Sequence, residues 1–407
     1  MKKIFNFYIK APLILRIAVG LVIGICFGLL LPEATAIAVF GSVFVGALKA
    51  VAPILVFVLV IASLASAGTG IGKRFGTVIF FYVISTFLAA VCAVVAMYIF
   101  PVTIPLVAAP DNSAPSGLGE VFATLLNNMV ANPISAIING NYVGILTWSV
   151  ILGIALRRLA SDKTKAVLND LSTAVSTVVG WVIQLAPFGI MGLVFSSVSE
   201  YGLEIFTDYG KLLLVLVGCM LLVALVVDPL IVGLSLKRNP YPLVFRCLRE
   251  SGITAFFTRS SAANIPVNMS LCNKLGLDKE YYSVAIPLGA TINMDGAAIT
   301  ITVMSLTAAF SQGVSVNIFL AILLSFVATL GACGTSGVAG GSLLLIPMAC
   351  SLLGVSPDVA MQMVGVGFIV GVVQDSLETA INSSGDVLFC ATAEYRDRMK
   401  KGEEIHF

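Results

Sequence analysis

Residues 318–352 have the sequence IFLAILLSFVATLGACGTSGVAGGSLLLIPMACSL, in which small and polar residues at 331–341 interrupt an apolar stretch. A second apolar stretch, at about 241–273, is interrupted in the same way by TRSSAANIP at 258–266. Such a break is unstable in hydrocarbon, because its backbone N–H and C=O groups find no water there. It persists only where protein buries it or where it lines a wet cavity. We therefore interpret both stretches as re-entrant helical hairpins of a membrane protein.

The composition supports a membrane protein. Of the 407 residues, 58% are hydrophobic and only 11% are charged, whereas soluble chains carry about 25% charged residues. The net charge of +2 argues against a nucleic-acid partner. The single histidine, His406, lies one residue from the end and leaves no histidine-based catalytic or metal site. The eight cysteines show no paired spacing, so we interpret them as small apolar residues rather than disulfides or metal ligands.

The remaining apolar stretches predict eight membrane-spanning helices. A crossing helix needs about 20 apolar residues, and stretches of about that length occur near 11–31, 37–66, 76–100, 142–158, 171–198, 211–236, 282–309 and 358–392. The basic start of the chain and the long apolar run after it predict a cytoplasmic tail and a first span, not a signal peptide.

The distribution of basic residues predicts the orientation. Of 23 lysines and arginines, 20 lie in the N-terminal segment or in the clusters 73–74, 157–165, 237–249, 274–279 and 396–401. The alternate loops have none. By the positive-inside rule both termini are cytoplasmic. The two hairpins then enter from opposite faces, which is typical of inverted repeats with a binding site near the midplane.

Polar side chains form one stripe along the last span, GVVQDSLETAINSSGDVLFC at 371–390. Asp375, Thr379, Asn382 and Asp386 are spaced four, three and four residues apart, so they share a helix face. Glu378 lies at the edge of this face. Carboxylate, hydroxyl and amide groups in a row suit an ammonium group, a carboxylate and a hard cation such as Na⁺. The alternative interpretation is a polar seam that joins helices.

The seventh span is interrupted in PLGATINMDGAAITI, 287–301, by Asn293, Asp295 and Gly296. An unwound turn there would expose carbonyl groups that can bind a cation, although a simple kink is the alternative. Ser260 and Ser261 offer hydroxyls and N–H groups at a helix N-terminus, where an anionic group is stabilised. The glycine-rich tip at 334–341 is suited to act as a lid.

Two further polar features have structural interpretations when they are taken alone. Tyr82, Ser85 and Thr86 in the third span are typical of hydroxyls that pack between helices. Asp228 precedes Pro229 near the cytoplasmic end of the sixth span, where it could satisfy backbone groups freed by the proline.

TRSSAANIP, NMDG at 293–296, GTSGV at 334–338 and D-x-x-x-T-x-x-N-x-x-x-D at 375–386 resemble the dicarboxylate/amino acid:cation symporter family, the glutamate-transporter type. Within it the chain is most similar to the bacterial sodium/serine-threonine symporters. The resemblance implies an all-α fold with eight spans and two opposed hairpins, a homotrimer, and a location in the bacterial cytoplasmic (inner) membrane. It also implies an elevator mechanism, with a scaffold at 1–72 and 101–210 and a transport domain at 73–100 and 211–407.

The family motifs also assign residues. The resemblance implies that Asp375 binds the ammonium group of the substrate and that Thr379 supports this contact. Around the substrate carboxylate it places Asn382, Ser260, Ser261 and the backbone at Val338 and Gly340. One Na⁺ site would comprise Asp386, Gly289, Asn293 and Asn382. A second would comprise Thr291, Ala332, Cys333 and Thr335. A third, which replaces the packing interpretation above, would comprise Tyr82, Ser85, Thr86, Asn293 and Asp295.

Three departures from the glutamate-specific members concern the substrate. Those members have an arginine where this chain has Glu378, a threonine where it has Ala297, and a lid proline where it has Ala339. The first two groups receive the acidic side chain of the substrate. The resemblance thus implies Na⁺-coupled import of L-serine and L-threonine rather than an enzymatic activity. We expect Glu378 to pair with Arg259, a pair that Asp375 could share; the alternative is a protonated Glu378.

Two other classes of function remain as alternatives. An ion channel would repeat its selectivity groups in rings along a pore, whereas two unlike hairpins here converge on one site. An intramembrane aspartyl hydrolase would need two carboxylates that share a proton. Asp375 and Asp386 lie three helical turns apart, about 16 Å, so they cannot form that pair, although Asp295 with either remains geometrically possible.

The absence of a basic residue at 378 leads to a prediction about selectivity. Excess aspartate or glutamate should leave uptake of labelled serine by proteoliposomes nearly unchanged, because like charges placed together in an interface cost several kcal/mol. Unlabelled serine, as the control, should compete fully. Strong uptake of glutamate by the unmodified protein would contradict the selectivity argument.

Overall fold

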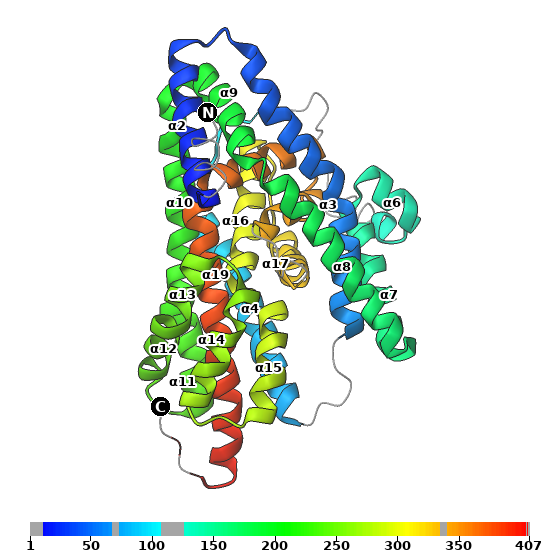
Figure 1. Cartoon of the computed structure of the whole chain (residues 1–407), viewed down its shortest axis with the longest axis vertical. Helices are drawn as coiled ribbons and strands as arrows, with labels where there is room; N and C mark the ends of the chain where they lie inside the picture. The colour runs from blue at the N-terminus through cyan, green and yellow to red at the C-terminus, as the bar shows by residue number, and fades with distance from the viewer. Residues whose placement is uncertain (1–10, 67–72, 107–125, 334–339, 404, 406–407) are drawn as a thin grey trace.

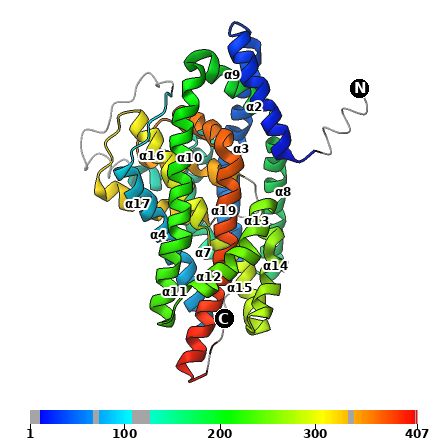
Figure 2. The ribbon, with the colours of Figure 1, turned by 90° about the vertical axis from the view of Figure 1, so that its left-hand side faces the viewer.

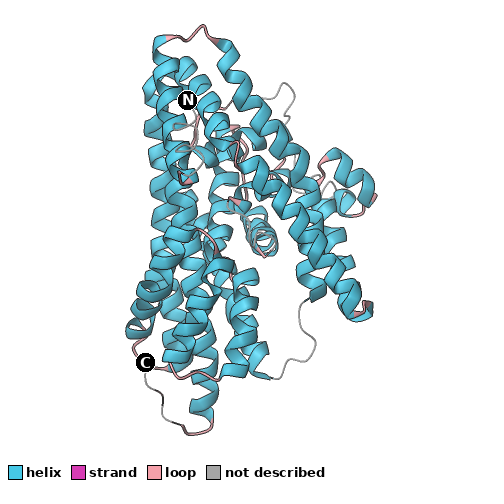
Figure 3. Cartoon of the chain, viewed as in Figure 1, coloured by secondary structure: helices cyan, strands magenta, loops and turns pink. Residues whose placement is uncertain are grey.

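A computed structural model of the chain describes residues 11–66, 73–106, 126–333, 340–403 and 405. The regular structure in these residues is entirely helical (Figure 3). In order, the elements are α2 (Leu13–Leu30), η1 (Thr35–Ile37), α3 (Ala38–Ser66), α4 (Lys73–Ile99), α6 (Pro133–Asn139), α7 (Tyr142–Leu159), α8 (Asp162–Ile183), α9 (Ala186–Tyr201), η2 (Gly202–Glu204), α10 (Ile205–Leu222), η3 (Val223–Val227), α11 (Asp228–Leu236), α12 (Tyr241–Cys247), η4 (Leu248–Gly252), α13 (Ile253–Thr258), α14 (Ser261–Lys274), α15 (Lys279–Ile292), α16 (Asp295–Ser311), α17 (Ile318–Ala332), η5 (Gly341–Leu345), α18 (Ile346–Leu352) and α19 (Pro357–Lys400).

Seven helical segments among the described residues are long and apolar enough to cross a membrane. They are Thr35–Ser66, Phe75–Ile99, Tyr142–Leu159, Asp162–Ile183, Ala186–Leu236, Lys279–Ser311 and Pro357–Lys400, and Leu15–Leu30 is a shorter apolar helix. The chain is therefore a multi-pass membrane protein.

The predicted span at 171–198 is interrupted by a turn, because α8 ends at Ile183 and α9 begins at Ala186. Pro187 occupies the first turn of α9. A proline has no N–H to donate, and its ring clashes with the carbonyl of the residue four positions earlier, here Ile183. A single helix through this point is thus unfavourable. Hydropathy averaged over a window does not detect such a break.

Both interrupted stretches form helix–break–helix segments. In the first, α13 ends at Thr258, Arg259 adopts the left-handed conformation with φ of 52°, and Ser260 caps α14 through its hydroxyl, which accepts from Ala263 N. In the second, α17 ends at Ala332, and η5 and α18 follow from Gly341. The tip at 334–339 lies outside the described residues.

The helices pack in two groups (Figure 1). One group contains α2, α3, α6, α7, α8 and α9, which pack most closely against one another. In the other, α4, α10–α16 and α18 pack around α19, a helix of 44 residues, and α17 packs against α4 and α16. Figure 2 shows α19 between α4 and α11 on one side and α13 and α14 on the other. The polar stripe of α19 is therefore enclosed by protein.

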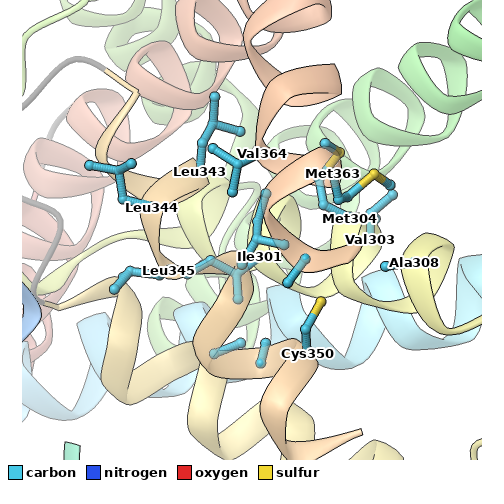
Figure 4. Packing of buried hydrophobic residues seen from close by; sticks show 14 of the residues in the cluster. Ile301, Val303, Met304, Ala308, Leu343, Leu344, Leu345, Cys350, Met363 and Val364 are labelled. Atoms are coloured by element: carbon cyan, nitrogen blue, oxygen red, sulfur yellow. The ribbon is translucent and has the colours of Figure 1, made fainter. Parts of the chain in front are cut away.

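Helix α16 packs against α19 both in an apolar core and next to the polar stripe of α19. On the extracellular side expected from the sequence, Ile301 and Met304 of α16 pack with Leu343 of η5 and Val364 of α19 in an apolar core (Figure 4). Nearer the stripe, α16 approaches α19 at Gly296, where a Cβ would lie 2.7 Å from Glu378 Cα. Only a residue without a side chain permits this approach.

This close contact gives a prediction about stability. Gly296→Ala should destabilise the purified protein by about 1–3 kcal/mol, because the added methyl group meets backbone rather than a flexible side chain. The measurement is thermal unfolding in detergent. Gly46→Ala is the matched control, since a Cβ at Gly46 in α3 meets nothing within 4 Å. Equal unfolding temperatures for the two variants would refute the packing argument.

Candidate functional site

The polar stripe of α19 forms as the spacing predicts. Asp375, Thr379, Asn382 and Asp386 all lie within the one helix, and all four are buried. Thr379 donates its hydroxyl hydrogen to the Asp375 carbonyl one turn earlier, at 2.8 Å. The hydroxyl oxygen of Thr379 is therefore oriented by its own helix.

The seventh predicted span unwinds at the predicted position. α15 ends at Ile292 and α16 begins at Asp295, while Asn293 and Met294 between them have non-helical backbone angles. Asn382 of α19 bridges the break: its Oδ1 accepts from Gly296 N at 2.8 Å, and its carbonyl accepts from Asn293 Nδ2 at 3.0 Å. The break is thus held by α19 rather than being a simple kink.

Asp386 is completely buried, and among the described residues only side-chain amides donate to its carboxylate. Asn293 Nδ2 lies 3.3 Å from Oδ1, and Asn268 Nδ2 lies 3.5 Å from Oδ2. A Cβ at Gly289 would lie 2.9 Å from Oδ1, so glycine allows α15 to come this close. The structure therefore brings together the four residues of the first predicted Na⁺ site, and among the described residues Asp386 has no cationic partner.

Asp295 is also completely buried and has hydroxyl partners from α4. Ser85 Oγ and Thr86 Oγ1 donate to its Oδ1 at 2.9 and 2.8 Å, whereas Oδ2 has no partner among the described residues. Tyr82 contributes its carbonyl, which accepts from Thr86, while its hydroxyl donates to the backbone of Asp386 at 3.0 Å. The third predicted Na⁺ group is therefore assembled, and Tyr82 connects it to the first.

Part of the second predicted Na⁺ group lies outside the described residues, namely Thr335. Cys333 Sγ donates to the carbonyl of Ile292 at 3.6 Å, so the end of α17 reaches the end of α15. Ala332 precedes Cys333 and is buried. Thr291 donates its hydroxyl to Leu288 O at 2.7 Å within α15.

Arg259, at the break between α13 and α14, forms an ion pair with Asp375. Its Nε donates to Asp375 Oδ2 at 2.7 Å, and its Nη2 contacts the same oxygen. From the second interrupted segment, Gly340 N lies 3.5 Å from Asp375 Oδ1. Ser261 is buried beside the same break, whereas Val338 lies outside the described residues. Both segments thus meet at Asp375.

The predicted Glu378–Arg259 pair is wrong. Glu378 Oε2 instead accepts from Thr300 and Ser342, each at 2.8 Å, and from Gln374 Nε2. Glu378 follows Asp375 by three residues, and on a helix this spacing separates the directions of the two side chains by about 60°. Glu378 therefore faces α16 and η5, while Asp375 faces Arg259. Ala297, the other selectivity position, is completely buried in α16.

Sequence reasoning missed a group of polar side chains that connects α14 to α19. Asn264 Nδ2 donates to Ser383 Oγ at 2.8 Å, and Asn268 Nδ2 donates to the Ser383 carbonyl at 3.0 Å. Asn268 also reaches Asp386, as described above. The available signal was the spacing of Asn264 and Asn268, four residues apart on one helix face in an apolar segment.

Asp228, at the start of α11, is buried, and its Oδ1 has no hydrogen-bond partner among the described residues. The π-helical turn η3 immediately precedes it, and both η3 and α11 pack against α4. The described residues thus provide no hydrogen bond that would support the structural interpretation of Asp228 made from the sequence.

The space beside the Arg259–Asp375 pair is small. A cavity of about 20 Å³ is lined by both residues, by Gly340 and by Leu13 and Ile17 of α2. A single water needs roughly 10–15 Å³ of such space, so the cavity in this structure is too small for an amino acid.

Comparison with known proteins agrees with this geometry. Residues 13–395 match the model of the sodium:dicarboxylate symporter family. The chain is 59% identical over 406 residues to the serine/threonine transporter SstT of Bifidobacterium adolescentis, covering 100% of this chain and 94% of that protein. It is 57% identical to the proteins of the same name from Streptococcus agalactiae, over 97% of this chain and 98% of that one, and from Enterococcus faecalis, over 97% and 94%. The chain therefore belongs to the sodium:dicarboxylate symporter family, as a transport protein and not an enzyme.

Proposed function

We propose that the protein imports L-serine and L-threonine with Na⁺ across the bacterial cytoplasmic membrane. The names of relatives at 54–59% identity support the substrate. The observation that carries the coupling is the burial of Asp295 and Asp386 without a cationic partner among the described residues. A buried charge without a partner is strongly destabilising, and every side-chain donor around both carboxylates is an amide or hydroxyl whose oxygen suits Na⁺.

The proposed substrate site is centred on Asp375. The substrate ammonium would take the place of the Arg259 guanidinium, which occupies the carboxylate in this structure. The substrate carboxylate would meet Asn382, Ser260 and Ser261, with backbone N–H groups at Val338 and Gly340. Since the adjacent cavity is only about 20 Å³, Arg259 and the segment around Gly340 would have to move as serine enters.

The proposed selectivity for neutral substrates rests on how the charges near the site are already paired. Arg259 is neutralised by Asp375, and Glu378 keeps its hydroxyl and amide donors. Among the described residues that line the cavity, only Arg259 is a cation. Once displaced, Arg259 would stay close to the Asp375 carboxylate, which would offset its attraction for an acidic substrate side chain. A short hydroxyl side chain needs no cation, and Ala297 adds no polar group that would favour an acidic one.

Coupling between ion and substrate would pass through two asparagines. A Na⁺ ion at Asp386 would share the carboxylate with Asn293, which in turn donates to the carbonyl of Asn382. Asn382 is the residue that would bind the substrate carboxylate. An ion at Asp386 would thus fix the backbone break and orient the substrate-binding amide together. A second ion at Asp295 would hold the same break from the α4 side, and a third would lie near Thr291, Ala332 and Cys333.

The two groups of helices support the proposed division of labour. The helices α2, α3 and α6–α9 lie within 1–72 and 101–210, the proposed scaffold. The helices α4 and α11–α19 lie within 73–100 and 211–407, the proposed transport domain, and α10, which packs with this second group, begins at Ile205, before the proposed boundary. We propose eight spans with cytoplasmic termini, two re-entrant hairpins, a trimer assembled through the scaffold, and elevator-like sliding of the transport domain.

The proposed Na⁺ role of Asp386 predicts a coupling defect. Asp386→Asn should raise the Na⁺ concentration needed for half-maximal serine uptake by about tenfold or more, because the variant no longer offers a negative charge to the ion. The measurement is Na⁺-titrated uptake in proteoliposomes. Asp208→Asn, which removes only a surface pair with Lys211, is the control. An unchanged Na⁺ response in Asp386→Asn would refute the assignment.

The proposed ammonium site predicts a binding defect. Asp375→Asn should weaken serine binding by a factor of about a few hundred or more, since removing one partner of a buried charge pair costs about 3–5 kcal/mol. The measurement is calorimetric titration of detergent-purified protein with serine in saturating Na⁺. Asp358→Asn, at an exposed pair with Lys49, is the matched control. Binding within tenfold of the unmodified protein would mean that another residue holds the amine.

A further inference from the structure

A groove of about 570 Å³ lies on the surface between α4, α11 and the end of α19, away from the α19 polar stripe. Its apolar wall includes Phe80 and Ile84 of α4 and Ile231 and Leu234 of α11. Phe80 is 58% exposed and Leu234 is 71% exposed. In a membrane protein, large apolar side chains exposed to this degree face lipid, so the groove is open to the bilayer.

Three cations lie at one end of this groove, namely Lys237, Arg396 and Lys400. Lys237 follows the last residue of α11, and Arg396 and Lys400 belong to the last turns of α19. Figures 1 and 2 place the C-terminal ends of α11 and α19 at the same end of the molecule. The groove is therefore amphipathic along its length, with its cations at the end where these helices stop.

These cations have no carboxylate partner among the described residues. The guanidinium of Arg396 lies over the ring of Phe81, 6.0 Å from its centroid. The neighbouring acids of α19 are already paired, Glu394 with Arg398 and Asp397 with Lys401. An anion entering this end of the groove would thus meet three positive charges, and the residues that line the groove include no carboxylate.

We propose that the groove binds one anionic phospholipid, with its phosphate at Lys237, Arg396 and Lys400 and an acyl chain along α4 and α11. Basic pockets at the ends of membrane helices attract anionic headgroups, each lysine or arginine contributing to the attraction. A soluble anion would leave the apolar wall uncovered, and a zwitterionic lipid would bring its own cation to a cationic site. The proposed orientation of the chain decides only which leaflet supplies the lipid, and with cytoplasmic termini it would be the cytoplasmic leaflet.

The test uses the full-length protein in detergent, to which dioleoyl-phosphatidylglycerol or dioleoyl-phosphatidylcholine is added. Native mass spectrometry measures how much of each lipid remains bound. The unmodified protein should bind phosphatidylglycerol in preference to phosphatidylcholine. The Lys237→Ala/Arg396→Ala/Lys400→Ala variant should lose affinity for phosphatidylglycerol by a factor of about ten or more. The control is Arg158→Ala/Lys163→Ala/Lys165→Ala, which removes the same charge from two exposed positions and one half-buried position on α7 and α8.

A second variant tests the apolar wall separately. Leu234→Trp keeps every charge and places a larger side chain in the groove, so it should also weaken phosphatidylglycerol binding. Undiminished preference in the triple variant, or an equal loss in the control, would overturn the proposal, the latter because it would show attraction to surface charge in general. Na⁺-dependent serine uptake by the same variants in phosphatidylcholine vesicles is a separate readout, whose failure would count against the proposed function and not against the lipid site.

Discussion

Buried negative charge that the chain does not itself neutralise is the constraint on which the site depends. Asp295 and Asp386 lie in the interior of a membrane protein, and only hydroxyl and amide groups of the described residues donate to them. Such donors lower the cost of a carboxylate but do not neutralise its charge. The helices around α19 thus enclose two carboxyl groups, and the proposed Na⁺ ions would supply the positive charge that the described residues do not. A transporter that requires its ion needs this property.

The backbone break at Asn293 and Met294 follows from the same requirement. A continuous helix would direct its carbonyls along its own axis, whereas the break leaves Asn293 free to contact α4 and α19 at once. Gly289 and Gly296 on either side let α15 and α16 approach Asp386 and Glu378. The break, the glycines and the asparagines together form one structural unit. The geometry of this unit would change when a proposed Na⁺ ion binds to Asp295 or Asp386.

Local patterns in the sequence predicted the parts of the structure that depend on one helix at a time. The stripe on α19 follows from helical spacing, and the break between α15 and α16 follows from polar and glycine residues in an apolar run. The parts that depend on how helices are oriented toward each other were not predictable in this way. Arg259 pairs with Asp375 instead of Glu378 because the rotation of α19 decides which acid faces the α13–α14 break. The division of 171–198 at Pro187 was visible in the sequence, but an averaged hydropathy window conceals one proline.

Glu378 illustrates how the surroundings of an acid, rather than its presence, determine what it can do. From the sequence it is a charge that needs a basic partner, and Arg259 is the one arginine in the hairpin motif. In the structure Thr300, Ser342 and Gln374 surround one of its oxygens, so it is accommodated without a cation and connects α16 and η5 to α19. Asp228 is in the opposite situation, since it is buried and its Oδ1 lacks any described donor. Of the two acids, it is therefore Asp228, and not Glu378, that the described residues leave with an unpartnered buried oxygen.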